Sequence, residues 1–195
     1  MNILKLRFNI YILIVFVFLL SACGSDKIKN PLNYEVKDFQ YTNQKGESFG
    51  LQDLKGEVWV ANFIFTNCDD VCLPMTANMK LLQEKVKEEG IDNIQFVSFS
   101  VDPAVDSPEI LLEFANLFQV DESNWNFLTG YPQEDIEQFA LDTFNTIVKK
   151  PESGDQVIHG TSFYLINGEG KVMKDYTGLA EIPMDDIIND IKILQ

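Results

Sequence analysis

Two long apolar stretches constrain the fold of this chain more than any other feature. Residues 58–65 read VWVANFIF and residues 94–101 read IQFVSFSV. A strand covered by helices on both faces is apolar along most of its length, whereas a strand with one wet face alternates apolar and polar residues. Between the two stretches, apolar residues recur at helical spacing over residues 71–89, and a glycine follows. We therefore expect central strands buried on both faces, with a helix between them in the sequence.

The other secondary-structure signals surround this centre. Turn residues at 43–46 and 167–170 separate pairs of short strand signals, which indicates one hairpin before the central strands and another after them. The expected outer strands span residues 34–41, 47–51, 162–166 and 171–176, and the further helices span residues 108–118, 132–144 and 183–194. This order predicts an α/β fold, in which a central mixed β-sheet is flanked by helices and preceded by an N-terminal β-hairpin extension. The order resembles that of the thioredoxin-like fold.

The N-terminus has the layout of a secretory signal peptide. Lys5 and Arg7 form a basic start, residues 10–20 are uninterruptedly apolar, and small residues follow. A membrane-spanning helix needs about 20 apolar residues, so an uncleaved anchor is the alternative. Residues 20–24, LSACG, resemble a bacterial lipobox, in which the cysteine is lipid-modified and becomes the first mature residue. Two acyl chains on Cys23 would suffice for stable membrane attachment.

These signals divide the chain into three parts. We expect a lipoprotein-type signal peptide over residues 1–22, a lipidated tether over residues 23–33, and one domain over residues 34–195. The mature protein would lie on the extracytoplasmic face of the cell membrane. Removal of the leader would change the net charge from −15 to −17 and leave no arginine. A nucleic-acid binder is excluded by this charge, and the sequence contains no phosphate-binding glycine motif for a nucleotide.

Two cysteines in the domain are the first candidates for chemistry. Cys68 and Cys72 are four residues apart, so both thiols project from one face if a helix begins between them. Such a pair can chelate one ion or close a disulfide, and a helix N-terminus favours the reactive thiolate. Inert core cysteines are the alternative, but Asp69 and Asp70 between the two indicate an exposed turn.

The single histidine of the chain, His159, precedes the expected strand at residues 162–166. In a sheet of the predicted order, the loop entering that strand folds back beside the N-terminus of the first helix, so two thiolates and one imidazole could converge. Such a donor set suits copper, either Cu(I) or Cu(II). A structural zinc site would require a fourth protein ligand. Met75 and Met79 could add a thioether, but their helical spacing fits core packing better.

Asp102 directly follows the second apolar stretch, close to the expected site. It either turns the chain before Pro103 or lies behind the metal ligands, where its charge would attract a cation or a basic partner.

Several short motifs together resemble the Sco/SenC family of copper-binding lipoproteins and membrane proteins, most of all its Bacillus-type lipoproteins. The resemblance extends over residues 32–191 and rests on FTNC with the following VC at residues 65–72, SFSVDP at 98–103, WNFLTG at 125–130, and QVIH at 156–159 before SFYLI. It implies that Cys68, Cys72 and His159 bind copper. It also implies a role in assembling the CuA centre of cytochrome c oxidase, with oxidase subunit II as partner.

One position departs from the family pattern. The family usually has proline directly after the second cysteine, whereas here Leu73 comes first and Pro74 follows. We expect this departure to alter the first helical turn at most, and it removes no ligand.

The sequence leaves three functions open. The first is a copper metallochaperone, which is not an enzyme. The second is a thiol–disulfide oxidoreductase that reduces the acceptor's cysteines, with Cys68 attacking and Cys72 resolving. Against it, such reductases usually have a CxxC motif and a cis-proline, and this chain has no proline between Pro151 and Pro183. The third, a peroxiredoxin-like peroxidase, relies on an arginine that the mature domain lacks.

Overall fold

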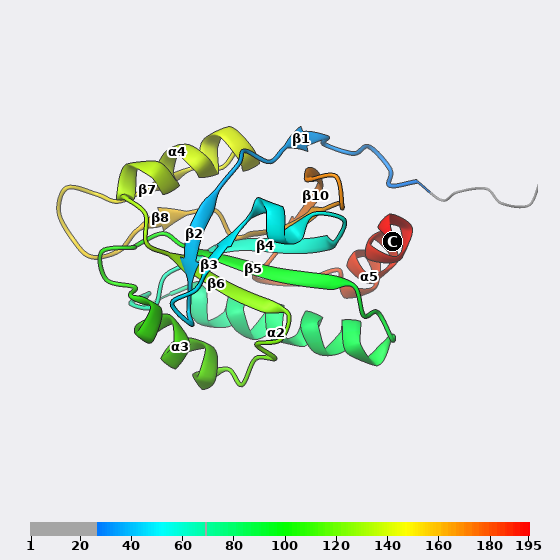
Figure 1. Ribbon diagram of the computed structural model, residues 1–195, viewed down its shortest axis with the longest axis horizontal. Helices are drawn as coiled ribbons and strands as arrows, with labels where there is room; N and C mark the ends of the chain where they lie inside the picture. The colour runs from blue at the N-terminus through cyan, green and yellow to red at the C-terminus, as the bar shows by residue number, and fades with distance from the viewer. Residues whose placement is uncertain (1–26, 69) are drawn as a thin grey trace, which may run out of the picture.

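A computed structural model describes residues 27–68 and 70–195 (Figure 1). An eight-stranded sheet has the order β1-β10-β9-β4-β5-β6-β2-β3. Its centre consists of three parallel strands, β4 (Val58–Ile64), β5 (Ile94–Ser100) and β6 (Trp125–Thr129). All seven residues of β4 are buried, as expected for a strand covered on both faces.

Antiparallel strands complete the sheet on both sides. On one side β9 (Ser162–Ile166) pairs with β4, and β10 (Lys171–Thr177) pairs with β9 as the predicted hairpin. On the other side β2 (Gln40–Asn43) pairs with β6 and forms the predicted N-terminal hairpin with β3 (Ser48–Gly50). A short 3-10 helix, η1 (Leu51–Leu54), follows β3. The expected mixed sheet is confirmed.

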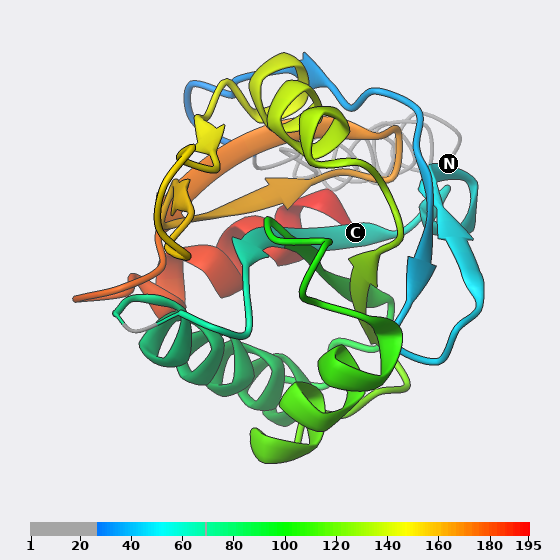
Figure 2. The same ribbon diagram turned by 90° about the vertical axis from the view of Figure 1, so that its left-hand side faces the viewer.

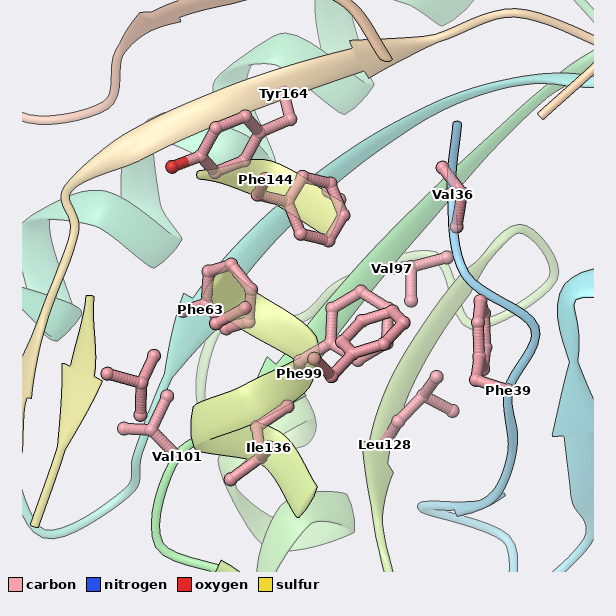
Figure 3. Packing of buried hydrophobic residues seen from close by; sticks show 14 of the residues in the cluster. Val36, Phe39, Phe63, Val97, Phe99, Val101, Leu128, Ile136, Phe144 and Tyr164 are labelled. Carbon is pink, nitrogen blue, oxygen red and sulfur yellow. The ribbon is translucent and has the colours of Figure 1, made fainter. Parts of the chain in front are cut away.

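Helices cover both faces of the sheet. On one face, α2 (Cys72–Glu88), α3 (Pro108–Leu117) and α5 (Met184–Leu194) bury their apolar sides in one core, which also contains residues of the central strands and of β9 and β10. Met75 and Met79 lie in this core with no exposed surface, as their spacing predicts. On the other face, α4 (Gln133–Phe144) packs onto an aromatic core. Figure 3 shows that core, in which Phe63 and Phe99 of the sheet meet Phe144 of α4.

Two parts of the fold differ from the expected elements. The strand expected over residues 34–41 is divided, because Val36 and Phe39 turn into the core between β1 (Tyr34–Glu35) and β2. β1 pairs with β10, at the opposite edge of the sheet from β2. A second, two-stranded sheet was also not expected, and it consists of β7 (Val148–Lys149) and β8 (Ile158–His159).

The segment before β1 contacts the domain. Ile28 is only 7% exposed and belongs to the same core as α5. The backbone N–H of Leu32 donates to the carbonyl of Met173 in β10, at 2.9 Å. The expected signal peptide and Cys23 lie outside the described residues. Among residues 27–68 and 70–195, none of the helices combines the length and apolar character needed to cross a membrane.

Candidate metal centre

The structure brings the two cysteines and the histidine together. The ligand atoms of Cys68, Cys72 and His159 all lie within 4.8 Å of one another. Cys68 follows the carboxyl end of β4, Cys72 is the first residue of α2, and His159 ends β8. Figure 2 looks at this end of the molecule, where the loop after β4, the N-terminus of α2 and the short β7–β8 sheet adjoin. The convergence follows from the topology, because ligand sites of open α/β sheets form beyond the carboxyl ends of the parallel strands.

A backbone hydrogen bond fixes the two cysteines relative to each other. The N–H of Cys72 donates to Sγ of Cys68 at 3.3 Å. The N-cap residue of α2, Val71, provides no side-chain acceptor, so the sulfur takes one of the free N–H groups of the first turn. Leu73 and Pro74 do not disturb this turn, since a proline there lacks only an N–H that has no helical partner. The helix begins at Cys72, and the N–H of Met75 donates to the carbonyl of Val71.

The contacts of His159 determine which ring nitrogen is free. Its Nδ1 lies 2.9 Å from the carbonyl oxygen of Gly160, and its Nε2 lies 3.3 Å from Sγ of Cys72. A carbonyl only accepts, so Nδ1 holds the proton and donates. The Nε2 lone pair therefore faces the cysteine pair, and a backbone contact that fixes the tautomer in this way is the usual arrangement of a metal-binding histidine.

Burial keeps two of these groups neutral. The pKa of Cys72 is raised far above its ordinary value, chiefly because burial removes water from the thiolate and also because Cys68 and Asp106 lie nearby. Burial likewise lowers the pKa of His159, against the opposing effect of the Gly160 carbonyl. A bound cation reverses the preference of the thiol, because the positive charge stabilises the thiolate in place of the proton. A bound ion would therefore displace the proton of the Cys72 thiol, and it would bind the neutral imidazole of His159 directly.

Asp106 lies beneath the cysteine loop and was missed from the sequence. Its carboxylate accepts the hydroxyl of Thr66 at 2.6 Å and the hydroxyl of Ser100 at 2.5 Å, and it has no exposed surface. It therefore ties the start of the cysteine loop to the end of β5. The one sequence signal at Asp106 is its position just before Ser107, the N-cap of α3. This position indicates a turn, but it does not indicate the buried hydrogen bonds of the carboxylate.

Asp102 has one of the two roles that were expected, and its side chain has a partner that was not expected. The turn before Pro103 is present, since the carbonyl of Asp102 accepts the N–H of Asp106 at 2.9 Å. The side chain, however, is only 2% exposed and forms an ion pair with Lys150 at 2.5 Å. Lys150 follows β7, so Asp102 holds the segment that leads to His159.

Comparison with known proteins agrees with this arrangement. The sequence profile of the SCO1/SenC family matches residues 29–194. The SCO1 protein homolog of Bacillus subtilis is 55% identical over 179 residues, which are 92% of this chain and 92% of the relative. The crystal structure of a SCO1/SenC family lipoprotein from Bacillus anthracis superposes with a TM-score of 0.83 at 59% identity, covering 86% of this chain and 98% of that one.

Two further structures share the fold. BsSco, described as a member of the Sco family of cytochrome c oxidase assembly proteins and as containing a disulfide switch, has a TM-score of 0.80 at 55% identity, over 87% of this chain and 98% of that one. ScoI of Arabidopsis thaliana, solved with copper bound, has a TM-score of 0.67 at 24% identity, over 80% and 96% of the two chains. At that identity, the second likeness shows the fold alone.

Proposed function

The chain belongs to the SCO1/SenC family, and we propose that it is a copper metallochaperone that binds the ion through Cys68, Cys72 and His159. The single observation behind this proposal is the convergence of two sulfur atoms and one imidazole nitrogen within 4.8 Å. The ion is cargo, and its acceptor is the CuA domain of cytochrome c oxidase subunit II. The description of BsSco as an oxidase assembly protein supports the choice of acceptor.

The donor set favours copper over the common alternatives. Thiolates suit soft Cu(I), imidazole suits Cu(II), and copper(II) binds more tightly than the other divalent ions of the first transition row. A structural zinc site takes four protein ligands, and among the described residues these three form the one cluster of metal-binding side chains. Three ligands also leave a position through which ligands of an acceptor can approach. Cys68 and His159 each keep some exposed surface, whereas Cys72 has none.

The place where residues 27–33 meet the domain supports a membrane-anchored chaperone. We propose that residues 1–22 are a signal peptide, that residues 23–33 are a tether, and that lipid on Cys23 holds the domain at the extracytoplasmic face of the membrane. The Bacillus anthracis relative is described as a lipoprotein. The chain enters the domain beside β10 and α5, at the end opposite the cysteine pair (Figure 1). An anchor at that end leaves the copper site facing away from the membrane.

Copper titration of His159→Ala tests the three-ligand site. We expect the wild-type chain to bind one Cu(II) with thiolate-to-copper absorption, and we expect the variant to bind more weakly with a changed spectrum. Mutation of a residue that orients a metal ligand lowers metal affinity by about 10–100-fold, and loss of the ligand itself should lower it at least as much. Cys68→Ala and Cys72→Ala should each abolish the thiolate absorption of the intact pair. Equal affinity and absorption in His159→Ala would refute the role of the imidazole.

A thiol–disulfide oxidoreductase is the second candidate. The two sulfur atoms are close enough to form a disulfide after a small adjustment, and BsSco is described as having a disulfide switch. In this function, Cys68, the more exposed thiol, attacks the disulfide of the acceptor and Cys72 resolves the mixed disulfide. Catalysed reduction of insulin with turnover, together with weak copper binding, would favour this function over the chaperone.

A further inference from the structure

His159 lies on a strap that is separate from the main sheet. We use the word strap for residues 148–159, which consist of β7, β8 and the segment between them. Val148 pairs with His159 and Lys149 pairs with Ile158, so any movement of the β7 end is passed across the ladder to the histidine. The position of the His159 side chain therefore depends on how firmly the strap is held to the domain.

Two lysines at the end of β7 hold the strap to the domain. Lys150 forms the ion pair with Asp102, two residues after β5, and its backbone N–H donates to Glu137 of α4 at 3.0 Å. Lys149 forms an ion pair with the same Glu137 at 2.8 Å. The two ion pairs differ in burial, because the Lys150 and Asp102 side chains are 29% and 2% exposed, whereas those of Lys149 and Glu137 are 64% and 19% exposed.

This difference decides which ion pair can fix the strap. An exposed pair contributes little, because water competes for both charges. A buried carboxylate that loses its partner is left desolvated, which is strongly unfavourable. Asp102 therefore favours only those arrangements of the strap that keep Lys150 beside it. Asp102 lies two residues after β5, which pairs with β4, the strand that leads to Cys68. The ion pair therefore ties the histidine strap to the segment beside the cysteine loop.

From this geometry we propose that the Lys150–Asp102 ion pair is a positioning device for His159, which places Nε2 against the cysteine pair and thereby sets the contribution of the imidazole to copper binding. The proposal rests on the proposed copper site. Neither residue contacts the ion in this scheme; both act through the strap.

Copper binding by variants of the full chain tests the proposal. We expect Lys150→Met to weaken Cu(II) binding by about 10-fold, as changes to residues that orient a metal ligand typically do. Its electron paramagnetic resonance spectrum should lose nitrogen coupling and approach that of His159→Ala. Lys150→Arg keeps the charge and should restore both readouts. Lys149→Met removes an equal charge from the same strap and should change affinity by less than about twofold, because its ion pair is exposed.

A double-mutant cycle distinguishes positioning from general destabilisation. If Lys150 acts through the imidazole, Lys150→Met should have no further effect on copper affinity in the His159→Ala background. Asp102→Asn combined with Lys150→Met should recover part of the nitrogen coupling, because no buried charge is left unpaired. A wild-type spectrum in Lys150→Met, or a full additional loss of affinity in the His159→Ala background, would overturn the proposal.

A measurement without copper separates this proposal from the proposed function. Amide hydrogen exchange reports the opening of the β7–β8 ladder directly. In the metal-free chain, the amides of β7 and β8 that bond across the ladder should exchange about 10-fold faster in Lys150→Met than in the wild type, and at an unchanged rate in Lys149→Met. If the wild-type chain binds no copper, the proposed function fails while this comparison still tests the ion pair. Equal exchange in all three proteins would show that the pair does not hold the strap.

Discussion

Asp106 places a fully buried carboxylate directly beneath the loop that leads to Cys68. Burial raises its pKa, and hydrogen bonds from Thr66 and Ser100 only partly oppose this effect. An acid with a raised native pKa stabilises the fold while it holds its proton. This contribution is fully present below the ordinary aspartate pKa, and it is lost as pH rises through the raised pKa of the native state.

The pH dependence of stability tests this assignment. As pH rises between the ordinary aspartate pKa and the raised one, the wild type should lose free energy of unfolding relative to Asp106→Asn, whose amide does not titrate. The measurement is urea unfolding of both proteins across that pH window, with Asp142→Asn on the exposed side of α4 as the control variant. A constant difference between the wild type and Asp106→Asn would contradict a raised pKa.

Single residues also show what a sequence reveals about a site. Cys68, Cys72 and His159 were predicted because their residue types are scarce here and their spacing fits metal binding. Asp106 and Lys150 were not predicted, because aspartate and lysine are common and usually solvated. Their roles depend on contacts between residues distant in sequence, such as the pair formed by Asp102 and Lys150 across 48 positions.

At the scale of elements, periodicity predicted the long segments and missed the short ones. The helix expected over residues 71–89 is α2 (Cys72–Glu88), because several apolar residues repeat along it and a glycine ends it. β7 and β8 contain two residues each, so they have no period to detect. They form because the buried Val148 and Val157 anchor the strap in the core, which is a tertiary effect.

The buried face of α2 allows a stability prediction that does not depend on copper. Met79 has no exposed surface, whereas Leu81 on the same helix is 54% exposed. We expect Met79→Ala to lower the free energy of unfolding by about 2–5 kcal/mol, through lost burial and the cavity that remains. Leu81→Ala should change it by less than about 0.5 kcal/mol, as surface substitutions usually do. Chemical denaturation of the metal-free proteins measures both values, and similar values for the two would contradict the packing of α2.

At the scale of the whole molecule, the two ends of the sheet are used differently. The candidate copper site lies at the carboxyl ends of the parallel strands, and the chain enters beside β10 and α5 at the other end (Figures 1 and 2). The segment at residues 27–33 was expected as part of a tether because it lacks apolar periodicity. Its contact with the domain includes the side chains of Ile28 and Leu32 and one backbone hydrogen bond, which are too few for a periodic pattern in the sequence.

Ile28 would therefore determine how closely the domain is held if Cys23 carries the proposed lipid. Its side chain is 7% exposed, while the neighbouring Lys29 is exposed. We expect Ile28→Ala to lower the free energy of unfolding by about 2 kcal/mol, the low end for a buried isoleucine, because the segment lies at the edge of the core. Lys29→Ala is the matched control and should have little effect, and copper affinity should stay unchanged in both variants, since the site is at the opposite end. Urea unfolding and copper titration of the two proteins provide these values. Wild-type stability of Ile28→Ala would mean that the segment does not pack on the domain in solution. A lipid on Cys23 would then hold the domain through a longer flexible linker.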